Sequence, residues 1–92
     1  MMVEEILISN LSLFPNPSMG VFKLRLDSKM KTSFELEILS STGQVLYVSS
    51  EEISEGLNEI SINQPDLSNG LYLIKLKNSE TGVLETIHFM KK

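Results

Sequence analysis

The chain has 92 residues, which is enough for one domain with a single core and too few for two. Apolar residues make up 41% of it and charged residues 22%, a balance that fits a globular domain and excludes a disordered chain or a fibre. The net charge of -4 argues against a nucleic-acid partner, and a chain without cysteine has no disulfide, thiolate nucleophile or Cys-ligated metal.

The first half of the chain predicts three strands. Two short apolar pieces, residues 6–8 and 11–13, can pair at a sheet edge, and residues 21–27 and 34–38 alternate apolar with polar side chains. A helix over 30–38 was considered, but the strict alternation favours a strand. The side chains expected on the inner face are Phe22, Leu24, Leu26, Phe34, Leu36 and Ile38.

The second half predicts four more strands. Residues 45–48 form a short apolar run rich in β-branched and aromatic types, while residues 57–62 and 72–77 alternate again and residues 84–90 end the chain as a strand. The side chains expected on the inner face are Ile60, Ile62, Tyr72, Ile74, Leu76, Ile87 and Phe89.

Turn signals separate these strands at a spacing that suits hairpins. Each contains a residue that tolerates positive φ. The four are Ser41-Thr42-Gly43, Glu55-Gly56, Asn69-Gly70 and Thr81-Gly82. Short strands with turns every ~8–12 residues, and no helical periodicity, predict an all-β fold: a small immunoglobulin-like antiparallel β-sandwich of about seven strands.

Groups able to do chemistry are scarce. His88 is the one imidazole, and its parity in the last strand places it on the solvent face. Glu35 and Glu37 lie two apart on one strand face, where pairing across strands is a better explanation than catalysis. Their candidate partners are Lys23, Arg25, Lys75 and Lys77. Since no metal-ligand spacing is present either, we expect no enzyme, no cofactor and no metal site.

Three segments, in order along the chain, carry a family resemblance. Residues 13–20 read LFPNPSMG, residues 36–46 read LEILSSTGQVL, and residues 66–76 read DLSNGLYLIKL. Together they resemble the C-terminal sorting domain, type A, of Bacteroidetes proteins exported by the type IX (Por) secretion system. The motif residues are Pro15, Asn16, Pro17, Gly20, Gly43, Gly70 and Tyr72. The chain departs from the family at Phe14, where Tyr is common, and at Glu85, Thr86 and His88, where Lys is frequent.

Each motif residue also has a sufficient structural use. The prolines stiffen residues 14–17 into an extended segment. The glycines suit turns that a β-branched residue could not enter, and Tyr72 is expected to bury its ring while its hydroxyl finds a backbone partner.

The resemblance implies a sorting signal attached to a cargo protein. It implies a C-terminal sorting domain at 13–92, preceded by residues 1–12 as a linker or edge strand. The implied partners are an outer-membrane translocon, a surface sortase and a covalent N-terminal cargo domain, with passage through the periplasm to the cell surface or medium. The end of the chain, Phe89, Met90, Lys91 and Lys92, would be a docking element for the translocon, although a solvated terminus is an equal reading of the two lysines.

The start of the chain bears on whether it is part of a longer precursor. No apolar run reaches the ~20 residues of a membrane helix, and Met1 to Glu5 lack the basic and apolar regions of a signal peptide. The chain is then either cytoplasmic or the tail of a longer precursor, and we favour the second.

The alternative function is a non-catalytic adhesion or carbohydrate-binding module, since small sandwiches serve many roles. It is disfavoured because the chain has no Trp, and its six Phe and Tyr residues are needed for the core. Open sheet edges also predict partner binding by strand addition at the first or last strand, or an edge-strand dimer.

Overall fold

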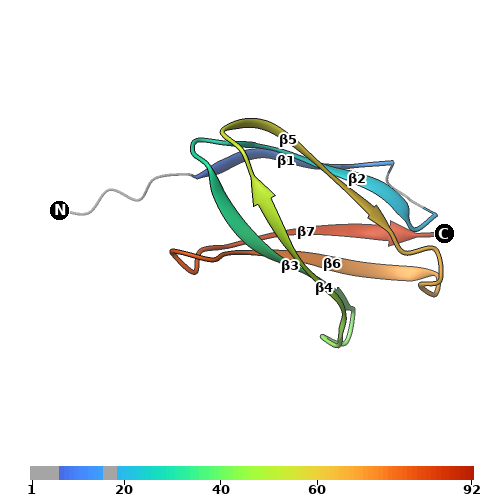
Figure 1. Ribbon diagram of the computed structural model, residues 1–92. Coiled ribbons are helices and arrows are strands. Elements are labelled where there is room, and N and C mark those ends of the chain that lie inside the picture. Colours follow the sequence, from blue (N-terminus) through green and yellow to red (C-terminus); the bar gives the residue numbers. More distant parts are fainter. Residues whose placement is uncertain (1–6, 16–18) are drawn as a thin grey trace.

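All regular structure in the described part of the chain is β. The computed structural model describes residues 7–15 and 19–92, and within these ranges the chain forms seven antiparallel strands in two layers (Figure 1). The strands are β1 (Ile8–Phe14), β2 (Val21–Ser28), β3 (Thr32–Ser40), β4 (Val45–Ile53), β5 (Gly56–Asn63), β6 (Gly70–Asn78) and β7 (Leu84–Lys91). The predicted fold class and the seventh strand are confirmed, and the segment considered as a helix is strand β3.

The two layers are a three-stranded sheet, in the order β1-β2-β5, and a four-stranded sheet, in the order β4-β3-β6-β7. Only the turns β1–β2, β3–β4 and β6–β7 are hairpins within one sheet. The expectation of hairpins at Glu55-Gly56 and Asn69-Gly70 is therefore wrong, because there the chain crosses from one sheet to the other. A glycine permits a sharp turn, but the sheet that the next strand joins depends on where its apolar face can be buried.

The core lies between the inner faces of the two sheets. Every side chain expected there is buried, except Ile87, which is partly buried against the same cluster. The buried apolar residues are Ile8, Leu13, Phe22, Leu24, Leu26, Phe34, Leu36, Ile38, Ile53, Ile60, Ile62, Tyr72, Ile74, Leu76 and Phe89. The period of two in the sequence thus marks the inner faces correctly.

Strand β4 is longer than its apolar run indicated. It extends to Ile53, and it is Ile53 that is fully buried, whereas Val45, Leu46 and Val48 are exposed. An irregularity in the pairing follows Ile38, at the start of β4. Val45, Leu46 and Val48 therefore contribute an exposed apolar surface, whereas the partly buried Tyr47 packs against the core.

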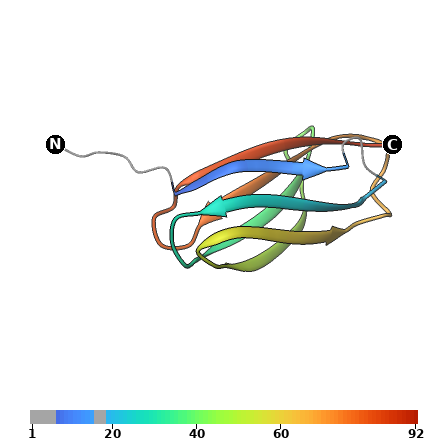
Figure 2. The same cartoon turned by 90° about the horizontal axis from the view of Figure 1, so that it is seen from above.

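The turns of the sandwich gather at two opposite ends. We call the motif end the set formed by residues 15, 19–20, 41–44, 64–69 and 89–92, and the Asn78 end the set formed by residues 29–31, 54–55 and 78–83. Strand β1 starts at the Asn78 end, where Ile8 pairs with Ser28, and β7 finishes at the motif end (Figures 1 and 2).

Candidate functional site

The motif residues singled out from the sequence come together at one end of the molecule. Pro15 and Gly20 lie in the β1–β2 connection, Gly43 lies in the β3–β4 turn, and Gly70 and Tyr72 begin β6. All of these belong to the motif end or adjoin it, as does the end of β7. Asn16 and Pro17 lie outside the described residues.

Gly20 is the point where two connections of the motif end touch. Its φ is +93°, and its carbonyl accepts a hydrogen bond of 2.6 Å from the backbone N–H of Gln64. A Cβ added to Gly20 would clash with the Gln64 carbonyl oxygen and stand 2.8 Å from the Cα of Pro65. Only glycine fits both the conformation and the space, so this motif position has a firm structural cause.

An aromatic cluster lies directly beneath the motif end. Phe89 packs between two rings, with its centroid 4.6 Å from that of Phe22 and 5.3 Å from that of Tyr72. The Tyr72 hydroxyl donates a hydrogen bond to the Ser68 carbonyl. Tyr72 therefore ties the 64–69 connection to the core, with its ring buried and its hydroxyl on a backbone partner as the sequence predicted.

The last strand presents two different sides. Phe89 is 1% exposed and belongs to the core, whereas Met90 points outward opposite Leu71. The Nζ of Lys91 donates a 2.8 Å hydrogen bond to the Pro65 carbonyl, which joins the end of the chain to the 64–69 connection. Of the expected docking element, Met90 and Lys92 are exposed, Lys91 is half-buried and Phe89 is buried.

A shallow hollow of about 230 Å³ lies on the outside of the four-stranded sheet near the motif end. Gly43 and Tyr72 contribute to its wall, and the exposed His88 borders it, so the expected outward position of this histidine is confirmed. None of the described residues that line it is a carboxylate. The hollow thus lacks the acid that orients a catalytic imidazole.

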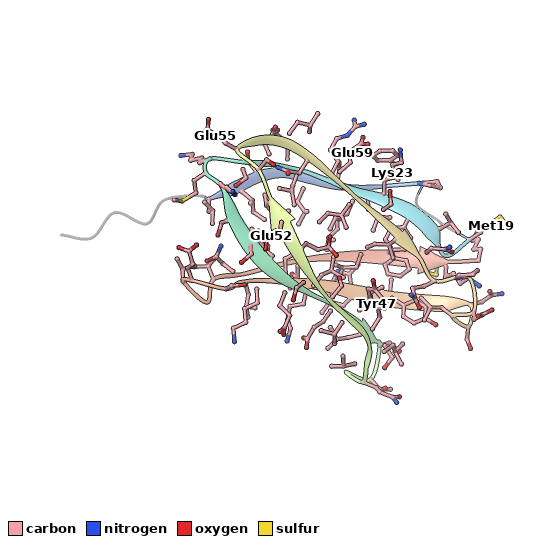
Figure 3. The ribbon with its side chains drawn as sticks, in the orientation of Figure 1. Met19, Lys23, Tyr47, Glu52, Glu55 and Glu59 are labelled. Carbon is pink, nitrogen blue, oxygen red and sulfur yellow. The ribbon has the colours of Figure 1, made fainter. Side chains whose placement is uncertain are left out.

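Charged side chains form cross-strand pairs on the outer faces of both sheets. Glu37 pairs with Lys75 at 3.3 Å, as one of the predicted alternatives has it. Lys23 and Arg25 cannot reach Glu37, because β2 lies in the other sheet; both instead bind Glu59, which lies beside Lys23 in Figure 3. The hydrogen bond from Arg25 holds the pKa of Glu59 below its ordinary value of 4.5, and the positive charges of Lys23 and Arg25 lower it further.

A sugar-binding platform is not evident in the described parts of the chain. There, Phe14 is the one exposed Phe or Tyr side chain, and the guanidinium of Arg25 lies 4.7 Å from the centre of its ring. Residues 7–15 and 19–92 also contain no group of three acidic or His side chains placed to hold a metal ion. No helix that could cross a membrane occurs in them.

Sequence reasoning missed the 64–69 connection as a partner of the motif residues. Gln64, Pro65 and Ser68 bind Gly20, Lys91 and Tyr72 through backbone atoms. Backbone contacts leave little trace in residue types: Pro65 and Asn69-Gly70 indicate a turn there, but not which residues the turn contacts.

Comparison with known proteins gives one match. A family model described as a secretion system C-terminal sorting domain matches residues 12–89, which is most of the chain and includes all three motif segments. No curated protein matches the chain, and no solved structure does.

Proposed function

The chain belongs to the family of C-terminal sorting domains of the type IX secretion system, and we propose that it directs a cargo protein joined to its N-terminal side across the outer membrane. The family indicates export to the cell surface or into the medium, and interaction with the secretion system. The observation that carries the proposal is the match over residues 12–89. The gathering of the motif residues at one end supports it.

The proposed route has four steps. The precursor crosses the inner membrane by a signal of its own, its folded C-terminal domain is recognised in the periplasm, and the outer-membrane translocon moves it out. A surface sortase then breaks a peptide bond ahead of residue 13 and transfers the carboxyl group of the cargo to anionic lipopolysaccharide. The sorting domain, residues 13–92, leaves with a new amino terminus.

The geometry of the sandwich suits such a role. Strand β1 starts at the Asn78 end, so a cargo attached before Leu7 would sit there, away from the motif end. We propose that the machinery contacts the motif end through Met90, Lys91 and Lys92, which are held in place by the core position of Phe89 and by the Lys91–Pro65 hydrogen bond. Gly20, Gly43, Gly70 and Tyr72 would act by shaping this end.

Domains of this family are not catalytic in general, and we propose that this chain has no activity of its own. The chemistry of the exported protein would then reside in the cargo. An open strand edge is a second route to a partner, and β7 suits strand addition, or an edge-strand dimer, better than β1. The pairing of β7 runs from Leu84 to Lys91 without a shift in register, whereas that of β1 shifts between Ser9 and Ser12.

The direct test places residues 1–92 behind a signal peptide and a fluorescent cargo in a host with a type IX system. We expect fluorescence at the cell surface, accessible to added protease. Retention of the cargo in the periplasm would contradict the proposal. The same fusion in a strain without the translocon is the control for leakage.

A second comparison separates recognition from folding. Deletion of Lys91 and Lys92 removes one half-buried and one exposed side chain together with the Lys91–Pro65 hydrogen bond, and it is expected to lower export strongly while the thermal midpoint of the isolated domain falls modestly. Asn78→Ala, at the other end, is expected to lower the thermal midpoint by more than the deletion does, and to reduce export by less. If export follows the midpoint in both variants, the motif end is not a recognition surface.

A further inference from the structure

The outer face of the four-stranded sheet has an unusual arrangement of charge. On β3, Glu35 and Glu37 project from the face two residues apart, and on the neighbouring β6 their register partners are Lys77 and Lys75. The outer face of β3 therefore carries a column of two acidic side chains, and that of β6 a column of two basic side chains directly beside them in the register. One step nearer the motif end, Leu39 stands beside Leu73 in the same two columns.

This face is also more apolar than a solvent-facing sheet side usually is. Outward positions on a half-buried antiparallel sheet are typically polar. Here five apolar side chains around the charged columns are substantially exposed: Val45 (47%), Val48 (52%), Leu71 (46%), Leu84 (51%) and Met90 (39%). They lie on β4, β6 and β7, on both sides of the charged columns, so apolar surface flanks the charges on this face.

The two columns are complementary to themselves. Consider a two-fold axis parallel to the strands, above the outer face and midway between β3 and β6. It would place β3 of one copy over β6 of the other, and each residue would keep its position along the strand direction. Glu37 would then face Lys75 of the second copy, Glu35 would face Lys77, and Leu39 would face Leu73. On the outer strands, Val48 would meet Thr86, and Val45 would meet His88. No like charges face each other in this arrangement.

We propose that this outer face is the contact surface for a second copy of the chain, packed face to face about that axis. Sheets pack in this way about 10 Å apart, with their strands within ~30° of each other. The central Glu37–Lys75 pair, already joined at 3.3 Å within one copy, would become part of a four-charge cluster. This dimer goes beyond the sorting function and uses a different surface from an edge-strand dimer.

The size of the face sets the expected strength. Four strands spaced ~4.8 Å apart, over about seven residues each, cover a plan of roughly 400 Å², compared with ~800 Å² per partner in stable interfaces. We therefore expect a weak dimer with a Kd of ~100 μM, which forms only where copies of the chain are concentrated.

The test reverses the charge of one column in each of two variants. One variant is E35K/E37K and the other is K75E/K77E, and each places like charges on both central strands. Sedimentation of the wild-type chain from ~10 μM to ~1 mM should show a monomer becoming a dimer across the expected Kd. Each variant alone should stay monomeric over that range, and an equimolar mixture should dimerise, because every facing pair is again opposite in sign.

Two controls make the outcome specific. The variant E55K/D66K has the same net charge as E35K/E37K but changes exposed residues outside the strands. Because E55K/D66K keeps the wild-type face, its mixture with K75E/K77E should contain only the E55K/D66K homodimer and no mixed dimer. Circular dichroism verifies that each variant is folded. A wild-type chain that stays monomeric at ~1 mM, or a mixture that does not recover the dimer, would overturn the proposal. A wild-type dimer that survives in both single variants would indicate an edge-strand contact instead.

Discussion

The motif end and the Asn78 end of the sandwich are stabilised by different interactions. At the motif end, three aromatic rings pack together in the core and two connections meet at Gly20. At the other end, a single amide organises the β6–β7 turn. Asn78 is 1% exposed; its Nδ2 donates to the Thr32 hydroxyl at 3.0 Å, and its Oδ1 accepts hydrogen bonds from the backbone N–H groups of Glu80 and Thr81 at 2.9 and 2.8 Å.

The contrast separates family signature from stability. Both ends are tightly bonded, yet the three segments that resemble the family include Gly20 and Tyr72 at one end and exclude Asn78 at the other. Structural need alone therefore does not select the signature, since Asn78 is as firmly placed as Tyr72. Residues of the motif end shape the surface that we propose is recognised, whereas we expect Asn78 to act through folding, since its hydrogen bonds hold the β6–β7 turn to β3. The following variants test how far the two ends differ.

The largest effect is expected from Phe89→Ala at the motif end. Removing a ring that is 1% exposed and packed between two other rings should lower the free energy of unfolding by about 3–5 kcal/mol. Urea unfolding followed by circular dichroism measures the loss. The neighbouring Met90→Ala, on the outer face, is the matched control and should cost less than about 1 kcal/mol. Equal losses would mean that β7 does not present its two sides as described.

At the other end, Asn78→Ala is expected to lower the free energy of unfolding by about 2–3 kcal/mol, because the Thr32 hydroxyl and two turn amides lose a buried partner. Hydrogen exchange should also show faster exchange of the Thr81 amide, with little change at Tyr72. The exposed Asn63→Ala is the control. Faster exchange at both ends would show that the ends are coupled.

Gly20→Ala isolates the close approach at the motif end. Gly20 and Gly43 have nearly the same φ, +93° and +90°, but a Cβ meets backbone only at Gly20. We expect a loss of about 1 kcal/mol for Gly43→Ala from the left-handed conformation alone, and about 2–3 kcal/mol for Gly20→Ala. Thermal unfolding of both variants measures the difference. If the two losses were the same, the contact with the Gln64 carbonyl would have no energetic weight.

The smallest effect is expected at Glu59, which lies between the two ends on the exposed side of β5. Because its folded-state pKa is lowered, chiefly by the Arg25 hydrogen bond, its contribution to stability is present above its ordinary pKa of 4.5 and is lost as the pH falls through the folded value. The difference in unfolding midpoint between the wild type and Glu59→Gln should therefore be small at neutral pH and shrink below pH 4.5. A difference that grows in acid would contradict the pairing.

Much of this site could be anticipated from the residues. Alternation placed Tyr72 and Phe89 on inner faces, and the glycines marked turns. The contacts between connections could not be anticipated, because Gly20 and Lys91 each contact a backbone carbonyl, of Gln64 and Pro65 respectively, which any residue carries. The exposed position of Val45 and Val48 was equally hidden, since an apolar run reads the same whether it faces the core or solvent.

The sequence by itself determined the strands, their inner faces, the all-β class and the family, because periodicity and ordered motifs are properties of neighbouring residues. The tertiary structure decided which sheet each strand joins, that the motif residues share one end, and that the acids of β3 stand beside the bases of β6. Those relations join positions far apart in the chain, and they follow from burying all the apolar faces at once in a single core.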